Sequence, residues 1–208
     1  MTFLALRLSG ILNIGLLLAS CLSAAQAQPA GDKYSRFQID SFSVEYPASW
    51  FYKPQPEANG SQLHMFVGPE ERDALPYCHV KQQPLNPAFA PRTTGMNESQ
   101  RAEFFVQNSN QEMLFSLYDN LASAQGFRLI HANASVLGSA TPAFLADFVF
   151  RVPQGFIYRV RSHYTFWSKA QLSIWCQTVS RSEKAGDDAF HRNLLAFQRF
   201  TASVKIIP

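Results

Sequence analysis

Several signatures of enzymes are absent from this 208-residue sequence. There is no Gly-x-Ser-x-Gly turn, which is the usual setting of a hydrolase serine. None of the five histidines is followed by another four residues later, and there is no Cys-x-x-Cys, so the common zinc patterns are missing. No glycine-rich loop follows a strand pattern, so nothing supports nucleotide binding. We therefore expect a protein that is not an enzyme and has no catalytic residues, no metal ligands and no cofactor.

The sequence also lacks a strong excess of one charge and a long apolar run. Lysine and arginine number 18 against 15 acidic residues, a formal net charge of +3, which gives no argument for nucleic acid as a partner. The longest apolar run, residues 11–19, is shorter than the ~20 residues that span a bilayer. We expect a soluble body with no membrane-spanning helix.

The first 27 residues have the pattern of a secretory signal peptide. Arg7 precedes the apolar run, and Ala25-Gln26-Ala27 is a small-residue cleavage site, which predicts a periplasmic or secreted protein. Leu18-Ala19-Ser20-Cys21 reads instead as a lipoprotein cleavage site, after which a lipid on Cys21 would anchor the chain to the envelope membrane. Both alternatives stay open, and contact with a membrane is expected only through such an anchor.

Cysteine is scarce. Of three cysteines, Cys21 is either removed or lipidated, which leaves Cys78 and Cys176 in an oxidising compartment. One interpretation is two buried thiols that behave as small apolar side chains. The other is a disulfide that closes a loop of nearly 100 residues. The sequence supports both, because it does not give the separation of the two Cα atoms.

The remaining chain is predicted to be a linker, residues 28–36, followed by one domain, residues 37–207. Alternating patterns predict a hairpin from residues 37–39 and 42–46. Residues 63–67 and 77–82 are short strand candidates that we interpret as edge or connecting strands. Three prolines and a glycine in residues 84–95 predict a loop.

Two helical regions are expected. Asn97 can cap a helix with Gln100, and Ser109 with Glu112 marks a second start, so helix is predicted to about residue 125. The last helix is predicted to start at Gly186 or Asp187. Its apolar stripe predicts the inward-facing residues Phe190, Leu194, Leu195 and Phe197.

The clearest pattern predicts a three-stranded antiparallel meander between residues 143 and 180. Phe144 to Val152 alternate, with Asp147 on the polar side, and Asp147 is predicted to oppose Arg161 or His163 on the next strand. If Trp167 faces Gln171 across the second turn, then His163 opposes Trp175. Together with the helices, this order of elements predicts an α+β fold in which a mostly antiparallel sheet carries packed helices.

This register predicts a candidate binding face. Its members are basic or aromatic, types common in binding hot spots: Arg151, Arg159, Arg161, His163 and Trp175. A structural explanation competes with it, because Asp147 would neutralise part of the charge. A second hypothesis is a carrier of a small ligand or metal that uses His79, His163 and the cysteines, since the two histidines could meet in a folded sheet.

Three stretches resemble the PsbP/Mog-like α/β/α sandwich superfamily. They are the Phe-Ser-Val-Glu-Tyr-Pro-Ala-Ser-Trp segment at 42–50, the Leu-Ser-Ile-Trp-Cys segment at 172–176 and the closing helix with Phe190, Phe197 and Phe200. The resemblance covers about residues 36–207 in the order of elements. It implies that fold and, because members of the family act by binding other proteins, a noncatalytic accessory protein of the bacterial envelope with an unidentified envelope partner.

Overall fold

The computed structural model describes residues 33–56, 61–84, 90–108, 124–167 and 170–207. Lys33–Pro208 form one compact unit. The predicted signal peptide, both cleavage sites, the lipidation candidate Cys21 and the second part of the first helical region, residues 109–123, lie outside the described residues. The first strand begins at Tyr34, so the folded unit starts inside the segment predicted as a linker.

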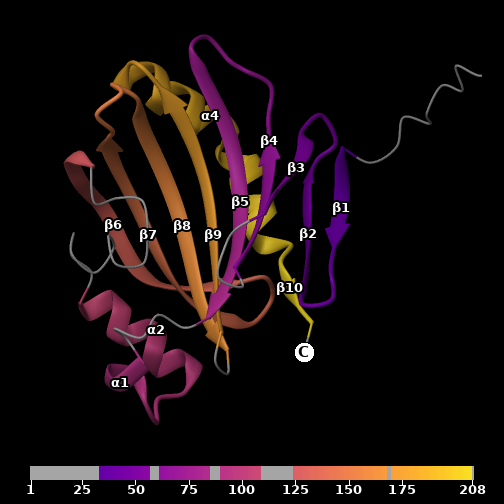
Figure 1. Ribbon diagram of the computed structural model, residues 1–208, viewed down its shortest axis with the longest axis vertical. Coiled ribbons are helices and arrows are strands. Elements are labelled where there is room, and N and C mark those ends of the chain that lie inside the picture. Colours follow the sequence, from indigo (N-terminus) through magenta and orange to yellow (C-terminus); the bar gives the residue numbers. More distant parts are fainter. Residues whose placement is uncertain (1–32, 57–60, 85–89, 109–123, 168–169, 208) are drawn as a thin grey trace, which may run out of the picture. The chain divides into compact units, whose positions relative to one another are not determined.

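A seven-stranded antiparallel sheet dominates the fold (Figure 1). Its strands, in spatial order, are β3 (Phe51–Pro56), β4 (Gln62–Val67), β5 (Ala74–Pro84), β9 (Ala170–Ser180), β8 (Ile157–Trp167), β7 (Thr141–Arg151) and β6 (Gln125–Leu137). The strands β7, β8 and β9, which follow one another in the chain, form the predicted meander. Strand β5 joins the meander to the strands that precede it in the chain.

Strands β4 and β5 correct one prediction. The segments 63–67 and 77–82 were expected to be edge or connecting strands, but neither is at an edge. Strand β4 pairs with β3 and β5, and β5 pairs with β4 on one side and β9 on the other. Its alternate buried residues, Cys78 and Val80 among them, face a packed core. Strands β3 and β6 were not predicted; they are the two edge strands of the sheet.

The second turn of the meander is one residue tighter than predicted. Trp167 pairs with Ala170, so Arg161 opposes Cys176, and Trp175 opposes Ser162 instead of His163. Successive side chains point to opposite faces of a strand, so this shift moves Trp175 to the face opposite Arg161. The first turn agrees with prediction, since Asp147 opposes Arg161.

A smaller antiparallel sheet contains β1 (Tyr34–Gln38), β2 (Phe42–Pro47) and β10 (Lys205–Ile206). It confirms the predicted N-terminal hairpin, and its turn is closed by a bond from the Ile39 amide to the Phe42 carbonyl. Phe42 and Val44 are buried and join the core that contains Phe66 of the large sheet.

The described helices are α1 (Ala90–Thr93), α2 (Glu98–Gln107) and α4 (Glu183–Ala202). Asn97 and Gln100 form the predicted capping box at the start of α2. Residues 84–95, predicted as a loop, contain the single turn α1. Helix α4 starts earlier than predicted, because Ser182 caps it, and Leu195 is 77% exposed instead of facing inward.

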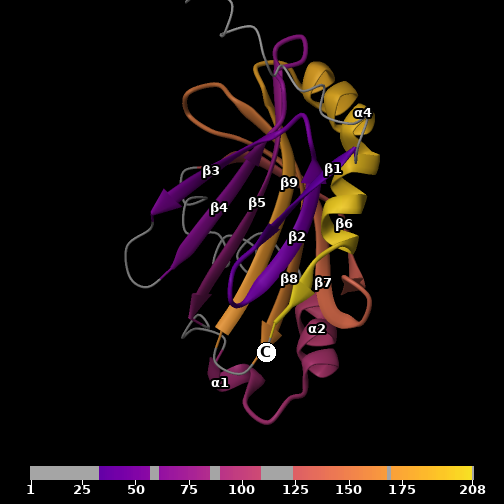
Figure 2. The ribbon, with the colours of Figure 1, turned by 90° about the vertical axis from the view of Figure 1, so that its right-hand side faces the viewer.

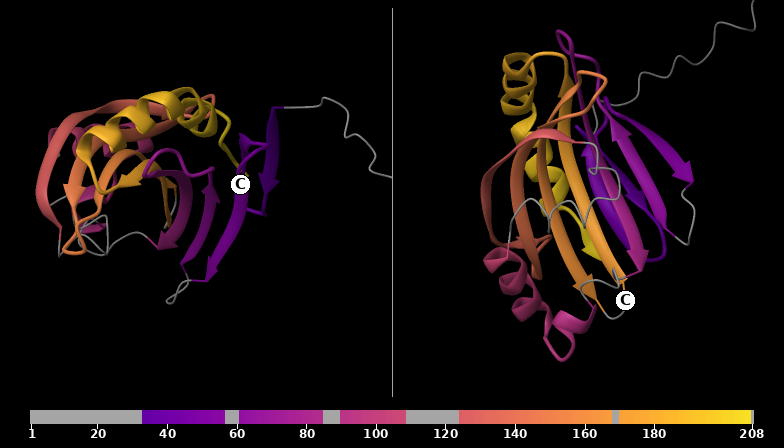
Figure 3. Two further views of the ribbon diagram at one scale, coloured as in Figure 1. Left: turned by 90° about the horizontal axis from the view of Figure 1, so that it is seen from above. Right: turned by 60° about the vertical axis from the view of Figure 1, so that its left-hand side comes forward.

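Helix α4 runs along the large sheet, whereas α1 and α2 lie near one end of it (Figures 2 and 3). The side-chain packing places α4 and α2 on opposite faces of the sheet. Helix α4 buries Phe190, Phe197 and Phe200 against the face that carries Cys78 and Cys176. On the other face, Phe105 of α2 is stacked on Phe166 at 4.5 Å between ring centroids, in a cluster with Phe144 and Tyr164. The sheet is therefore the middle layer between two apolar cores.

Candidate functional site

The predicted binding face lies largely beneath α4. Arg159 and His163 are 8% and 4% exposed, and Arg161 is partly buried; Arg151, at the end of β7, is exposed. These residues alternate along β7 and β8 on the face that carries Cys176, which α4 covers. Trp175 lies on the other face, where its ring is 4.6 Å from that of His79. The five residues therefore do not share one surface, which corrects the geometry of that prediction.

An ion network connects these buried charges. Arg161 donates two hydrogen bonds to Asp147, from Nε to Oδ1 at 2.9 Å and from Nη2 to Oδ2 at 2.7 Å. Arg159 Nε lies 3.4 Å from Asp187 Oδ1, and its guanidinium is 4.3 Å from the centroid of the Phe190 ring. Arg159 thus joins α4 to the sheet, whereas Arg161 links β8 to β7.

Burial and charge set the protonation of this network. The hydrogen bonds from Arg161 to Asp147 raise the pKa of Arg161, so its positive charge is secure. Burial, together with the nearby Arg161, lowers the pKa of His163 to about 4. His163 is therefore neutral at pH 7.

The residues of the metal hypothesis do not converge. His79 opposes Trp175 and lies on the face away from α4, whereas His163 opposes Ile174 on the α4 face. The sheet separates the two imidazoles, so they cannot share a ligand. The described residues contain no group of three or more His, Cys, Asp or Glu side chains arranged to hold a metal ion.

The two cysteines form a disulfide, one of the alternatives that the sequence left open. Cys78 on β5 and Cys176 on β9 are directly opposed, with a sulfur–sulfur distance of 2.03 Å and Cα atoms 4.0 Å apart. Both are fully buried in the core under α4. The bond fastens together two strands separated by 98 residues of sequence.

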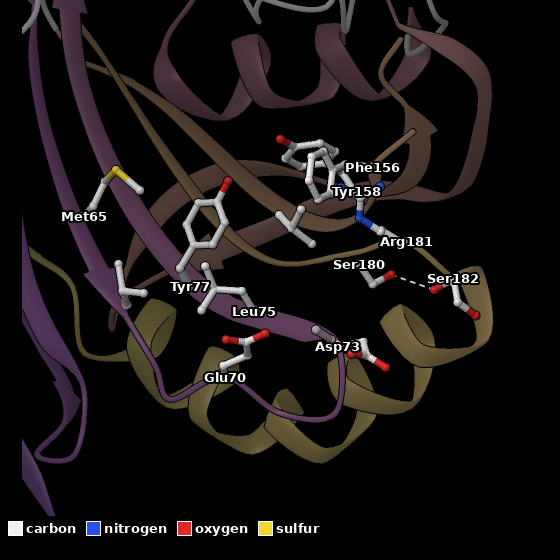
Figure 4. A pocket seen from close by; sticks show the side chains of 13 residues that line it. Met65, Glu70, Asp73, Leu75, Tyr77, Phe156, Tyr158, Ser180, Arg181 and Ser182 are labelled. Carbon is white, nitrogen blue, oxygen red and sulfur yellow. Dashed lines mark hydrogen bonds between the residues drawn. The ribbon is translucent and has the colours of Figure 1, made fainter. Parts of the chain in front are cut away.

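The face away from α4 carries a pocket of about 740 Å³ (Figure 4). It lies where β9 ends and β5 begins, and Leu75, Val179 and Tyr158 follow one another across three paired strands. The apolar part of the lining is Met65, Val67, Ala74, Leu75, Tyr77, Phe156, Tyr158 and Val179. Ligand sites in proteins are typically concave, mostly apolar and about 300–1,000 Å³ in volume.

The aromatic part of the pocket is held in place by its neighbours. The ring of Tyr158 is stacked on Phe150, with centroids 4.8 Å apart and ring planes 7° from parallel. Burial raises the pKa of Tyr77, and nearby Tyr158 acts in the same direction, whereas a hydrogen bond with the Gln177 side chain opposes it. The Tyr77 hydroxyl therefore stays protonated at neutral pH.

Charged residues of both signs, together with Ser180 and Ser182, complete the lining. Glu70 and Asp73 come from the connection between β4 and β5, and Arg181 comes from the connection between β9 and α4. Arg181 lies over the ring of Phe156, 4.7 Å from its centroid. Within the part of the chain that the structure describes, none of these three side chains forms an ion pair.

Sequence reasoning missed this pocket. Its charged residues lie in turns, between segments with recognisable alternation. Its apolar strand residues come from β4, β5, β8 and β9, and of the pairings among these four strands only that of β8 with β9 was predicted. Leu75 precedes the segment predicted as a strand, and Phe156 directly follows the Pro153–Gly155 turn. The one signal in the sequence was Phe156, an apolar residue directly beside a polar turn, where a side chain can contribute to a surface pocket.

Comparison with known proteins reveals similarity in structure alone. No protein-family model and no curated protein matches the chain. Among solved structures, the Ran-binding protein Mog1p of Saccharomyces cerevisiae matches with a TM-score of 0.53 and 9% identity over 85% of this chain and 97% of Mog1p. The chain has the PsbP/Mog-like fold.

Two more matches have lower TM-scores. The PsbP/Mog-like chain matches cyanobacterial PsbP (CyanoP) from Synechocystis sp. PCC 6803 with a TM-score of 0.49 and 15% identity, over 86% of this chain and 95% of CyanoP. It also matches LpqN, which is involved in cell envelope biogenesis of Mycobacterium tuberculosis. The TM-score is 0.46 and the identity 16%, over 86% of this chain and 87% of LpqN. At such low identity, similarity to a solved structure describes at most the fold and not the function. The described helices include none long and apolar enough to cross a membrane.

Proposed function

We propose that this protein is an exported, noncatalytic binding protein of the bacterial envelope and that it binds its ligand in the pocket opposite α4. The observation that carries the proposal is the pocket itself: about 740 Å³, mostly apolar, with a few charged groups at its margin. That combination of an apolar floor and few polar groups is typical of binding sites, in which the polar groups orient the ligand.

Two features support export. The first 27 residues have the three parts of a secretory signal. The Cys78–Cys176 disulfide suits an oxidising compartment, because cytosolic proteins rarely keep such bonds. The two features are independent, since one comes from the leader and the other from the folded unit.

The pocket's chemistry favours binding over catalysis. Its buried ionisable group, the Tyr77 hydroxyl, has a raised pKa and so is a poor nucleophile or base at neutral pH. Glu70, Asp73 and Arg181 are exposed at the margin of the pocket, where they can contact the charged groups of a ligand.

Two ligand types suit the pocket. An accessory protein would insert an apolar side chain of an envelope partner, and the partner would remain the active component. A carrier would enclose a small molecule, and the volume of the pocket favours this second candidate. A metal carrier loses its basis, because the cysteines are bonded to each other and His79 and His163 lie on opposite faces.

A photo-crosslinking amino acid at position 75 tests the proposal. Leu75 lines the pocket and is 36% exposed, while Leu195 on α4 is 77% exposed and outside the lining, so it serves as the matched control. After irradiation in the envelope of the native host, we expect an adduct at position 75 and none at 195. A large increase in mass identifies a partner protein, and a small one identifies a carried molecule. Equal labelling at both positions, or none at 75, would contradict the proposal.

A further inference from the structure

We propose that the pocket binds zwitterionic ligands of the apolar amino acid and short-peptide class. The ligand's ammonium group would lie near Glu70 and Asp73, its carboxylate near Arg181, and its apolar side chains on the aromatic floor. This inference rests on the proposed function, since it specifies the chemistry of the same site.

The charges of the pocket are divided between its sides. Figure 4 shows Glu70 and Asp73 projecting from one side, and Arg181 from the side of Phe156 and Tyr158. A ligand with only a carboxylate would satisfy Arg181 but leave both acidic residues unmatched. An amine without an acid would leave Arg181 unmatched. A zwitterion matches both sides, and complementary charge is a main source of specificity in binding.

The acidic side is built on a tight turn. Glu71 and Ala74 exchange two backbone hydrogen bonds of 2.8 and 2.9 Å, and the two residues between them, Arg72 and Asp73, have φ angles of 42° and 71°. Positive φ at both central positions is the geometry of the hairpin turns that match strand twist. The turn therefore holds Asp73, and Glu70 just before it, at a defined margin of the pocket.

The basic side is also arranged for a carboxylate. The guanidinium of Arg181 rests on the Phe156 ring, which restrains a long side chain before any ligand arrives. Its planar N–H groups can still donate two parallel bonds to a carboxylate, a geometry that lysine cannot supply. The Ser180 hydroxyl is already used, because it donates to the Ser182 carbonyl at 2.6 Å.

The apolar floor and the size of the pocket suit a short peptide. Met65, Leu75, Tyr158 and Val179 provide thioether, aliphatic and aromatic surface for apolar side chains. An extended dipeptide spans about 7 Å, so its charged ends are separated by a length that a pocket of about 740 Å³ accommodates. A single amino acid with a large apolar side chain fits the same description.

The probe is L-phenylalanyl-L-phenylalanine, titrated by calorimetry into the processed chain with its disulfide intact. The N-acetylated dipeptide lacks the ammonium, and the C-amidated dipeptide lacks the carboxylate. We expect saturable one-to-one binding of the free dipeptide and about tenfold weaker binding of each blocked form, the size of effect expected for one lost charge-assisted hydrogen bond.

Variants of the protein assign each end of the dipeptide. In Arg181→Ala, the free and amidated dipeptides should bind equally; in the Glu70→Gln, Asp73→Asn double variant, the free and acetylated ones should. The matched controls are Arg92→Ala on α1 and Glu103→Gln on α2, exposed residues outside the lining, which should leave all affinities unchanged. Thermal melting of each variant verifies that it is folded.

The inference is overturned if the free dipeptide shows no saturable binding, or if blocking either end leaves affinity unchanged. The two proposals remain distinguishable. An adduct at position 75 without dipeptide binding would retain the pocket as a binding site and reject the zwitterion. Failure of both experiments would reject both.

Discussion

Asp147 and Arg161 stand opposite each other on β7 and β8 and form a two-bond ion pair beneath α4. Asp147 is 4% exposed, so the pair is largely withdrawn from water. Two of the basic residues that suggest a binding surface in the sequence therefore have structural roles: Arg159 attaches α4 to β8, and Arg161 joins β8 to β7. Their charge is neutralised internally by Asp147 and Asp187.

Replacing Asp147 by Asn should destabilise the protein by about 3 kcal/mol, because breaking one partner of a buried ion pair leaves the other charge uncompensated. Urea denaturation followed by circular dichroism measures the change. The double variant Asp147→Leu, Arg161→Met removes both charges and should recover much of the loss. A single variant as stable as the wild type would show that water already solvates Arg161.

Stability should fall as the pH is lowered from 7 to 4. His163 has a folded-state pKa of about 4, below its ordinary value of 6.5, so the unfolded chain binds the proton more readily. The neutral, buried form is favoured above pH 6.5, and its advantage is lost between pH 6.5 and 4. The loss should be about 3 kcal/mol, by the relation between pKa shift and free energy.

The variant His163→Phe tests the source of that pH dependence. Phe keeps an aromatic ring but cannot titrate, so denaturation midpoints should vary less with pH. Burial also lowers the pKa of His79 to about 3, so the His79→Gln variant should reduce the pH dependence of the denaturation midpoint that remains in His163→Phe. An unchanged pH dependence in both variants would assign it to other groups.

Removing the disulfide should be costly. The Cys78→Ala, Cys176→Ala variant should lose about 3–5 kcal/mol of stability, since the bond closes a loop of 98 residues and so restricts the unfolded chain. Because both sulfurs are fully buried, reductant should act slowly on the folded protein and rapidly in denaturant. Mass spectrometry after alkylation follows the reduction. Rapid reduction without denaturant would mean that β5 and β9 separate readily.

Gly138→Ala should destabilise the protein more than Gly155→Ala. Both glycines have positive φ, 61° and 82°, which costs a non-glycine residue roughly 1–2 kcal/mol. A Cβ at Gly138 would also lie 2.0 Å from the Val204 carbonyl oxygen, whereas one at Gly155 meets nothing within 4 Å. Both substitutions carry the cost of positive φ, so the difference between their losses in unfolding free energy measures the steric clash with the Val204 carbonyl. Equal losses would show that the segment around Val204 shifts easily.

The sequence predicted the meander well because its residues obey one local rule. Alternation from Phe144 to Val152 is a property of neighbouring residues, and so is the capping box of Asn97 and Gln100. The register across the second turn depended on one assumed pair, Trp167 with Gln171. The actual pair, Trp167 with Ala170, differs by one residue, and that difference transfers Trp175 to the other face.

The candidate site could not be predicted from local sequence patterns. Its lining joins β4, β5, β8, β9 and the β9–α4 connection, and only the pairing of β5 with β9 brings Leu75 beside Val179. That pairing links strands far apart in the sequence. The two cysteines were the one indication of it, because a disulfide between residues 78 and 176 requires these residues to be close in space.

The β5–β9 pairing also has a consequence for the order of assembly. As the chain is synthesised, β6, β7 and β8 all follow Cys78 before its partner Cys176 appears. Until then, one edge of β5 lacks its neighbour and the thiol of Cys78 is available to wrong partners. Contacts so distant in sequence form slowly, because a long loop must close first. The newly made chain therefore passes through a period in which its N-terminal half has been synthesised but β5 has not yet paired with β9. A chaperone that protects the exposed strand edge would have most effect during this period.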